Sequence, residues 1–171
     1  MPFTRVVHLQ HEIFLVDADL EHPLDATAPE LQIRTLVNDL LRTLGMFELG
    51  ALQIYPATDQ RAPGWSFVQP ITTSHIASHY FERPGKHPHF HMDIYSCKSF
   101  DWRKVMEVLS RHRRLGAWKG NFIRRNMKSD KREVWEVTGR GQDVTEVLLL
   151  NPALAVPPLR TSADRMNVVG A

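Results

Sequence analysis

Cysteine is nearly absent from this sequence, since Cys97 is the only one among 171 residues. One thiol cannot close a disulfide within the chain, so we expect a reducing compartment, the cytoplasm. The sequence also lacks a run of about 18 apolar residues, and we therefore expect no membrane-spanning helix. Its first residues lack the apolar stretch and small-residue cleavage site of a secretion signal.

The chain has little net charge, +2 at pH 7, which gives no reason to expect an acidic partner. Its basic residues are nevertheless concentrated, because nine Lys or Arg and one acid lie between Arg111 and Arg132. This segment has no nucleic-acid-binding motif and no aromatic pattern for base stacking. We therefore interpret it as a solvated surface and expect no nucleic-acid partner.

Hydrophobic periodicity predicts several strands and two helices. The predicted strands cover residues 5–17, 47–55, 65–71, 74–82, 89–97, 118–125 and 133–137. We interpret 65–71 and 74–82 as one strand continued past a bend, next to Pro70. Residues 144–150 fit either a strand or a short helix.

The two predicted helices carry clear end signals. In the first, Thr27 and Glu30 have the spacing of a capping box, and Gly45 suits the C-terminal stop. In the second, Ser99 or Asp101 can cap the start.

The order of these elements predicts an α+β fold: a two-layer sandwich with a mostly antiparallel sheet and helices on one face. The strand–helix–strands order recurs loosely, which is consistent with two similar halves. We expect one domain over residues 1–150, followed by a Pro-containing, partly disordered tail over 151–171.

Candidate chemistry lies in the segment Thr72-Thr73-Ser74-His75-Ile76-Ala77-Ser78-His79. Ser74 and His79 are five residues apart, so a regular strand would put them on opposite faces. A bend at the start of the strand would be needed for them to meet.

Three motifs here occur together at spacings typical of one family. Ser74 begins a Ser-His-Ile segment with His79 five residues later, Gly64-Trp65-Ser66 lies upstream, and Asp93-Ile94-Tyr95-Ser96-Cys97 lies downstream. Over about residues 5–125 the chain resembles the bacterial S-adenosylmethionine decarboxylases, which make a pyruvoyl cofactor from an internal serine. Near the start, His8 and Glu12 match a histidine and an acidic residue of that family.

The resemblance implies roles for these residues. The Ser74 hydroxyl would attack the carbonyl of Thr73 to form an ester, with Ser66 helping to hold that carbonyl. His79 would remove the α-proton of Ser74, so that elimination and hydrolysis cleave the chain between Thr73 and Ser74. The resulting pyruvoyl group would form a Schiff base with the substrate amine, and Cys97 would return a proton.

The implied substrate is S-adenosylmethionine, decarboxylated for polyamine (spermidine) biosynthesis. The resemblance also implies a homodimer, with sites that can be built from both subunits. Phe81 stands where the family has tryptophan, and we predict that Phe81, together with Glu12, contacts the substrate.

Some residues depart from the family pattern. Thr73 replaces a glutamate, and Tyr80-Phe81-Glu82-Arg83 replaces Thr-Trp-Pro-Glu. An alternative function is therefore a pyruvoyl-dependent decarboxylase of arginine or ornithine, in which Glu82 or Asp93 would pair with the substrate cation. A second alternative is a non-cleaving binding homologue of the same fold.

His87, His89 and His91 form a histidine-rich insert. His89 and His91 share a face on a strand, but a metal site needs three or four ligands. We interpret the insert as a polar strand edge and expect no metal.

Overall fold

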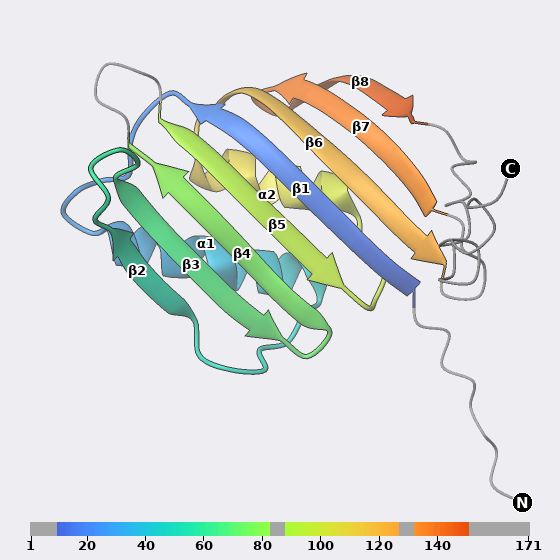
Figure 1. Ribbon diagram of the computed structural model, residues 1–171, viewed down its shortest axis with the longest axis horizontal. Coiled ribbons are helices and arrows are strands. Elements are labelled where there is room, and N and C mark those ends of the chain that lie inside the picture. Colours follow the sequence, from blue (N-terminus) through green and yellow to red (C-terminus); the bar gives the residue numbers. More distant parts are fainter. Residues whose placement is uncertain (1–9, 83–87, 127–131, 151–171) are drawn as a thin grey trace, which may run out of the picture.

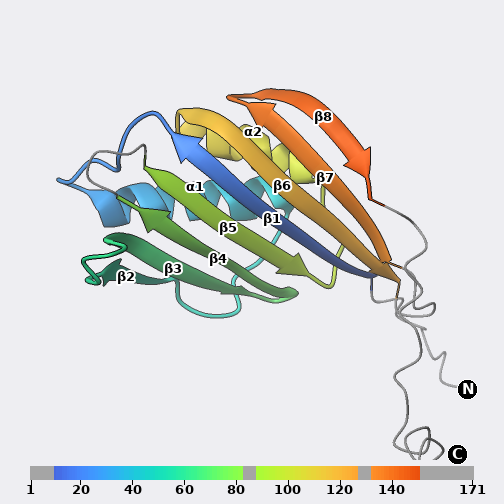
Figure 2. The same ribbon diagram turned by 45° about the horizontal axis from the view of Figure 1, so that its top comes forward.

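The computed structural model describes residues 10–82, 88–126 and 132–150. Eight strands form one sheet, and two helices lie side by side against one of its faces (Figures 1 and 2). The elements are β1 Gln10–Leu20, α1 Pro29–Leu44, β2 Gln53–Ala57, β3 Gly64–Ile71, β4 Ser74–Phe81, β5 His89–Ser96, α2 Trp102–His112, β6 Leu115–Asn126, β7 Arg132–Arg140 and β8 Asp143–Leu149.

The strand order across the sheet is β2-β3-β4-β5-β1-β6-β7-β8, and every neighbouring pair is antiparallel. This confirms the predicted α+β sandwich with its helices on one face. The element order strand–helix–three strands occurs twice along the chain. The first meander, β2 to β4, runs from the sheet edge inward, whereas the second, β6 to β8, runs outward.

The alternation of β1 separates the two faces of the sheet. Phe14, Val16 and Leu20 are buried on the side that packs against the helices, whereas Leu15, between them, is 41% exposed on the other side. We call this other side the open face, because none of the described elements covers it. The core therefore lies between the sheet and the helices, where α1 and α2 contribute fully buried leucines and valines.

Two of the predicted helix-end residues have the predicted role, and one does not. Gly45 ends α1 with φ 61°, the left-handed conformation that glycine adopts without steric cost. Asp101 caps α2 by accepting a hydrogen bond from the Arg103 N–H, at 2.9 Å. The predicted Thr27 cap is wrong, because the Thr27 hydroxyl instead donates to Asp25 and Ala28 takes the cap position.

Several strand predictions differ from the structure. Residues 65–71 and 74–81 form an antiparallel hairpin, β3 and β4, rather than one bent strand. β2 begins at Gln53, later than predicted. Of the two alternatives for residues 144–150, the structure has the strand, over residues 143–149. The predicted tail and the start of the first strand lie outside the described residues.

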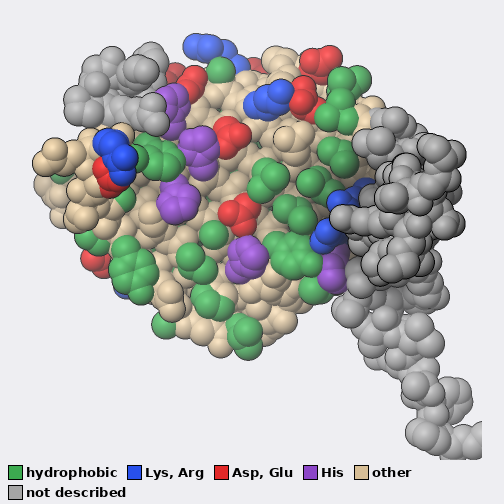
Figure 3. All heavy atoms as spheres, viewed as in Figure 1, with side chains coloured by type: hydrophobic (Ala, Val, Ile, Leu, Met, Phe, Trp, Pro, Cys, Tyr) green, Lys and Arg blue, Asp and Glu red, His purple; other side chains and the backbone are tan. Residues whose placement is uncertain are grey.

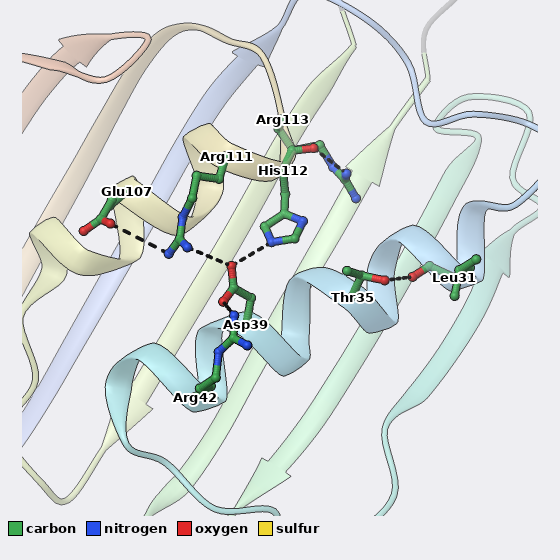
Figure 4. A network of polar contacts seen from close by, with 8 residues as sticks. All are labelled: Leu31, Thr35, Asp39, Arg42, Glu107, Arg111, His112 and Arg113. Atoms are coloured by element: carbon green, nitrogen blue, oxygen red, sulfur yellow. Dashed lines mark hydrogen bonds and ion pairs between the residues drawn. The ribbon is translucent and has the colours of Figure 1, made fainter.

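A polar network ties α1 to α2 (Figure 4). Asp39 of α1, whose side chain is only 8% exposed, accepts a hydrogen bond from His112 at 2.9 Å and pairs with Arg111 and Arg42. The hydrogen bond from His112 is the main cause that holds the pKa of Asp39 below its ordinary value, while burial acts in the opposite direction.

Neither helix is long and apolar enough to cross a membrane.

Candidate active site

The turn between β3 and β4 contains the most constrained backbone of the candidate site. Ile71 pairs with Ser74, so that Thr72 and Thr73 form a tight two-residue turn. Ser74 has φ 152° and is the only non-glycine residue with positive φ in the part of the chain that the structure describes. L-residues rarely adopt such a conformation, which costs on the order of 1–3 kcal/mol. Backbone strain is therefore concentrated at the Thr73–Ser74 junction.

The carbonyl of Thr73 has a specific donor. β5 lies beside β4 with Ser96 opposite Ser74, and the next residue, Cys97, donates its backbone N–H to the Thr73 oxygen at 2.9 Å. The Ser96 hydroxyl donates to the Thr73 hydroxyl at 3.2 Å. A backbone N–H in this position can stabilise negative charge that develops on the carbonyl oxygen. The structure thus brings Cys97, Thr73 and Ser74 together.

The Ser74 side chain contacts a histidine that the sequence-based prediction did not choose. Its hydroxyl lies 3.2 Å from Nδ1 of His75, and Nε2 of His75 lies 3.1 Å from Oδ2 of Asp93. Both partners belong to motifs that the sequence analysis singled out. Only the register between β4 and β5 shows that they meet.

Ser66 and His79 form a separate pair. They lie opposite each other on β3 and β4, with Ser66 Oγ 2.8 Å from His79 Nδ1. β4 is a regular strand from Ser74 to Phe81, so His79 lies about 16 Å along it from Ser74. The bend that would bring Ser74 and His79 together within the chain is absent. The structure therefore unites Ser66 with His79 but does not bring either to Ser74.

Glu12 lies on the opposite side of the sheet from His79, facing the helices. It is fully buried and accepts hydrogen bonds from the Phe100 N–H at 2.8 Å and from Arg124 Nε at 2.9 Å. A cavity of about 500 Å³ beside it is lined by aromatic and basic residues, including Trp102 and Trp135. Protein donors thus already satisfy this carboxylate. His8, its companion in the family pattern, lies outside the described residues.

A comparison with protein families matches residues 21–126 to the model of S-adenosylmethionine decarboxylase. This match covers more than half of the chain. The chain belongs to the S-adenosylmethionine decarboxylase family. The resemblance inferred from the sequence motifs is therefore confirmed, and the family indicates a decarboxylase. No curated protein matches the chain.

Two described residues that depart from the S-adenosylmethionine decarboxylase pattern lie on different faces. Tyr80 is buried toward the helices, and this burial raises its pKa to about 12. Phe81 lies on the open face, where its ring is 5.9 Å from that of His79 and 5.3 Å from that of His91. Of these two, only Phe81 can contribute to a site that contains His79. Arg83 lies outside the described residues.

The histidines of the insert pair with acids of β1 on the open face. His89 Nδ1 is 2.8 Å from Asp19, and His91 bonds to Asp17. Among residues 10–82, 88–126 and 132–150, no group of three or more His, Cys, Asp or Glu side chains could hold a metal ion. His87 lies outside these residues.

Histidines are a general feature of the open face. His11, His75, His79, His89 and His91 all belong to its strands β1, β4 and β5. Figure 3, which looks onto this face, shows histidines spread among hydrophobic side chains. The exposed hydrophobic residues include Val68 and Tyr55 on neighbouring strands.

Several residues of the basic segment, residues 111–132, form ion pairs within the protein. Arg111 pairs with Glu107 and Asp39, Lys119 with Glu136, and Arg124 with Glu12 and Glu133. Burial lowers the pKa of Arg113. These contacts favour the interpretation of the segment as structural and surface charge.

Proposed function

We propose that the chain is a self-processing, pyruvoyl-dependent decarboxylase that acts on S-adenosylmethionine. The observation that carries this proposal is the Thr73–Ser74 junction. It combines a strained serine backbone with a carbonyl that accepts the Cys97 N–H. A structural hairpin turn requires neither feature, whereas attack by the serine hydroxyl on the preceding carbonyl benefits from both.

Side chains of this protein supply the chemistry of self-cleavage, with His79 contributed by a second copy as proposed below. Ser74 Oγ attacks the carbonyl carbon of Thr73, the peptide bond breaks, and an ester links Thr73 to the Ser74 side chain. The Cys97 N–H stabilises the oxyanion of this step. His79 then removes the α-proton of Ser74, and the ester leaves as the carboxylate of Thr73. Hydrolysis of the dehydroalanine releases ammonia and leaves a pyruvoyl group at residue 74.

The residues at the junction fit this cofactor. Once formed, the pyruvoyl group would supply a ketone for the substrate amine and an electron sink for the loss of carbon dioxide. Cys97 follows the residue opposite Ser74, and we propose that its thiol returns a proton to the substrate carbon. Phe81 lies two residues beyond His79 on β4, so in the two-copy site proposed below the second copy's Phe81 would offer an aromatic face to the adenine or the sulfonium cation.

We further propose that the enzyme is a homodimer whose site uses both copies. His79 lies about 16 Å from Ser74 in one chain, too far for proton transfer. Two sheets packed by their open faces lie about 10 Å apart, so their side chains meet. A two-fold axis between the sheets that crosses β4 near Ile76 and Ala77 brings residue 79 of one copy over residue 74 of the other.

S-adenosylmethionine is preferred over arginine or ornithine as the substrate. The family description supports the former directly. Of the two carboxylates that could pair with a guanidinium, Asp93 already accepts from His75, which leaves only Glu82, just past the end of β4. The same reaction places the enzyme in polyamine biosynthesis.

Mass spectrometry under denaturing conditions tests the proposal. Self-cleavage divides the 19.7 kDa chain into fragments of roughly 8 and 11 kDa, the larger one beginning with a pyruvoyl group. Ser74→Ala should remain intact. The cleaved protein should release labelled carbon dioxide from carboxyl-labelled S-adenosylmethionine.

The two parts of the proposal can fail separately. An intact wild-type chain would contradict self-processing. Release from arginine or ornithine, with none from S-adenosylmethionine, would change the substrate and leave the cofactor in place.

A further inference from the structure

We propose that His75 is the base that activates Ser74 for the first step of self-cleavage, and that Asp93 holds His75 in the tautomer this step requires. The inference rests on the proposed function and deepens it. That function gives His79 a role in the later elimination but leaves the attacking hydroxyl without a base.

The hydrogen bonds determine which nitrogen of His75 carries the proton. An ionised carboxylate can only accept, so the contact of 3.1 Å between Nε2 and Asp93 places the hydrogen on Nε2. Nδ1 of the neutral ring then has a free lone pair, and it lies 3.2 Å from the Ser74 hydroxyl. This is the protonation state that a general base needs. The arrangement follows the logic of a serine–histidine–aspartate triad with the two ring nitrogens exchanged.

His79 is the other histidine on β4, and the geometry excludes it from this role within the chain. It lies about 16 Å from Ser74 along the strand, and its Nδ1 already bonds to Ser66 at 2.8 Å. His75 is adjacent to the nucleophile, and its ring lies between the Ser74 hydroxyl and the Asp93 carboxylate. Its nearest titratable neighbours are Asp93 and Tyr95 on β5, and its partner on β3 is Pro70.

The proposed step balances in atoms and charge. Nδ1 of His75 takes the hydroxyl proton as Ser74 Oγ bonds to the carbonyl carbon of Thr73. The imidazolium then gives this proton to the Ser74 nitrogen as the C–N bond breaks. The products are the ester and a free amine, and His75 returns to its neutral state. The positive charge held on His75 between these transfers is stabilised by the Asp93 carboxylate.

Hydroxylamine separates the two histidines experimentally, because it cuts esters under conditions that leave peptide bonds intact. We expect His79→Ala to accumulate the ester, which hydroxylamine cuts between residues 73 and 74. We expect His75→Ala to form the ester about 10²–10⁴-fold more slowly, so that the chain stays intact with and without hydroxylamine. Added imidazole should partly restore cleavage of His75→Ala. Time courses of the denatured mass measure all of these outcomes.

Asp93 positions His75, and the test is whether the effects of substituting Asp93 and His75 on the cleavage rate are coupled. If it acts through His75, the double variant His75→Ala/Asp93→Ala should cleave no more slowly than His75→Ala alone. Asp93→Asn keeps an oxygen that can accept from Nε2 and should retain part of the rate that Asp93→Ala loses. Additive losses in the double variant would overturn the role of Asp93.

The matched control is His89→Ala, which removes the similar His89–Asp19 pair at the start of β5 and should leave cleavage unchanged. Thermal melts identify any variant that fails to fold, and His75→Gln then replaces His75→Ala. Wild-type cleavage rates in His75→Ala and His75→Gln, or accumulation of a hydroxylamine-sensitive ester in them, would overturn the inference alone. A wild-type chain that stays intact and resists hydroxylamine would overturn the proposed function together with it.

Discussion

At the scale of single residues, Cys97 combines an observed backbone contact with a proposed chemical role. Its backbone N–H holds the Thr73 carbonyl, and its thiol is proposed to return a proton to the substrate. A side-chain substitution removes only the second. Substitution of Cys97 can therefore separate formation of the cofactor from turnover of the substrate.

Cys97→Ala should still cleave at a rate close to that of the wild type, because the backbone donor to Thr73 is retained. Its decarboxylation rate should fall by about 10²–10³-fold, the scale for loss of a positioned proton donor. The two rates are measured by denaturing mass spectrometry and by release of labelled carbon dioxide. If carbon dioxide release were unchanged, the thiol would have only a packing role.

The partners of Ser74 show what could and could not be predicted from one sequence. The identity of the reactive segment follows from residue types and spacing along the chain. Its contacts depend on pairing between strands, which puts Ser66 opposite His79 and Ser96 opposite Ser74. A register change of one residue would exchange the faces of these side chains. The contact between His75 and Asp93 therefore could not be predicted from the sequence, although both residues belong to its motifs.

At the scale of elements, local chemistry predicted most of the helices and strands. Burial repeats along a helix or strand with a fixed period, and Gly45 and Asp101 mark helix ends by their own conformations. The hairpin between β3 and β4 was missed because Thr72 and Thr73 are not typical of tight turns, which favour Gly, Asn and Asp. The Thr27 cap failed because Asp25 competes for the same hydroxyl.

The contact between α1 and α2 gives a prediction about stability. Asp39→Asn should lower the free energy of unfolding by about 1–3 kcal/mol at neutral pH, because the variant loses charge-assisted bonds in a largely buried place. The pKa of Asp39 is lower in the folded chain than in the unfolded one. Its contribution is therefore complete above the ordinary pKa and is lost as the pH falls below about 4.

Urea unfolding at several pH values measures this difference. The gap between wild type and Asp39→Asn should narrow as the solution is acidified. Asp59→Asn is a suitable control, because the Asp59–Arg61 pair is exposed and should matter little to stability. A gap that stays constant down to pH 3 would show that the charge of Asp39 is not what stabilises the contact.

At the scale of the whole molecule, the open face of the sheet is covered by none of the described elements. It contains Ser66, His79 and Phe81, and it exposes Val68 and Leu15 instead of a purely polar surface. The family match covers the strands that carry Ser74 and the Ser66–His79 pair, and this pair can serve its own Ser74 or that of a second copy. Only the separation along β4 favours the second copy.

Mixed dimers test this assembly. Neither Ser74→Ala nor His79→Ala should process itself, because each lacks one part of the machinery. Co-expressed with distinct tags, they can form dimers in which one site combines Ser74 of the His79→Ala chain with His79 of the Ser74→Ala chain. If the site uses both copies, the His79→Ala chain should be cleaved in about half of the molecules when the chains pair at random in equal amounts. If His79 acts within its own chain, no fragment should appear in the mixture, and the 16 Å between His79 and Ser74 would then have to close by a change in β4 itself.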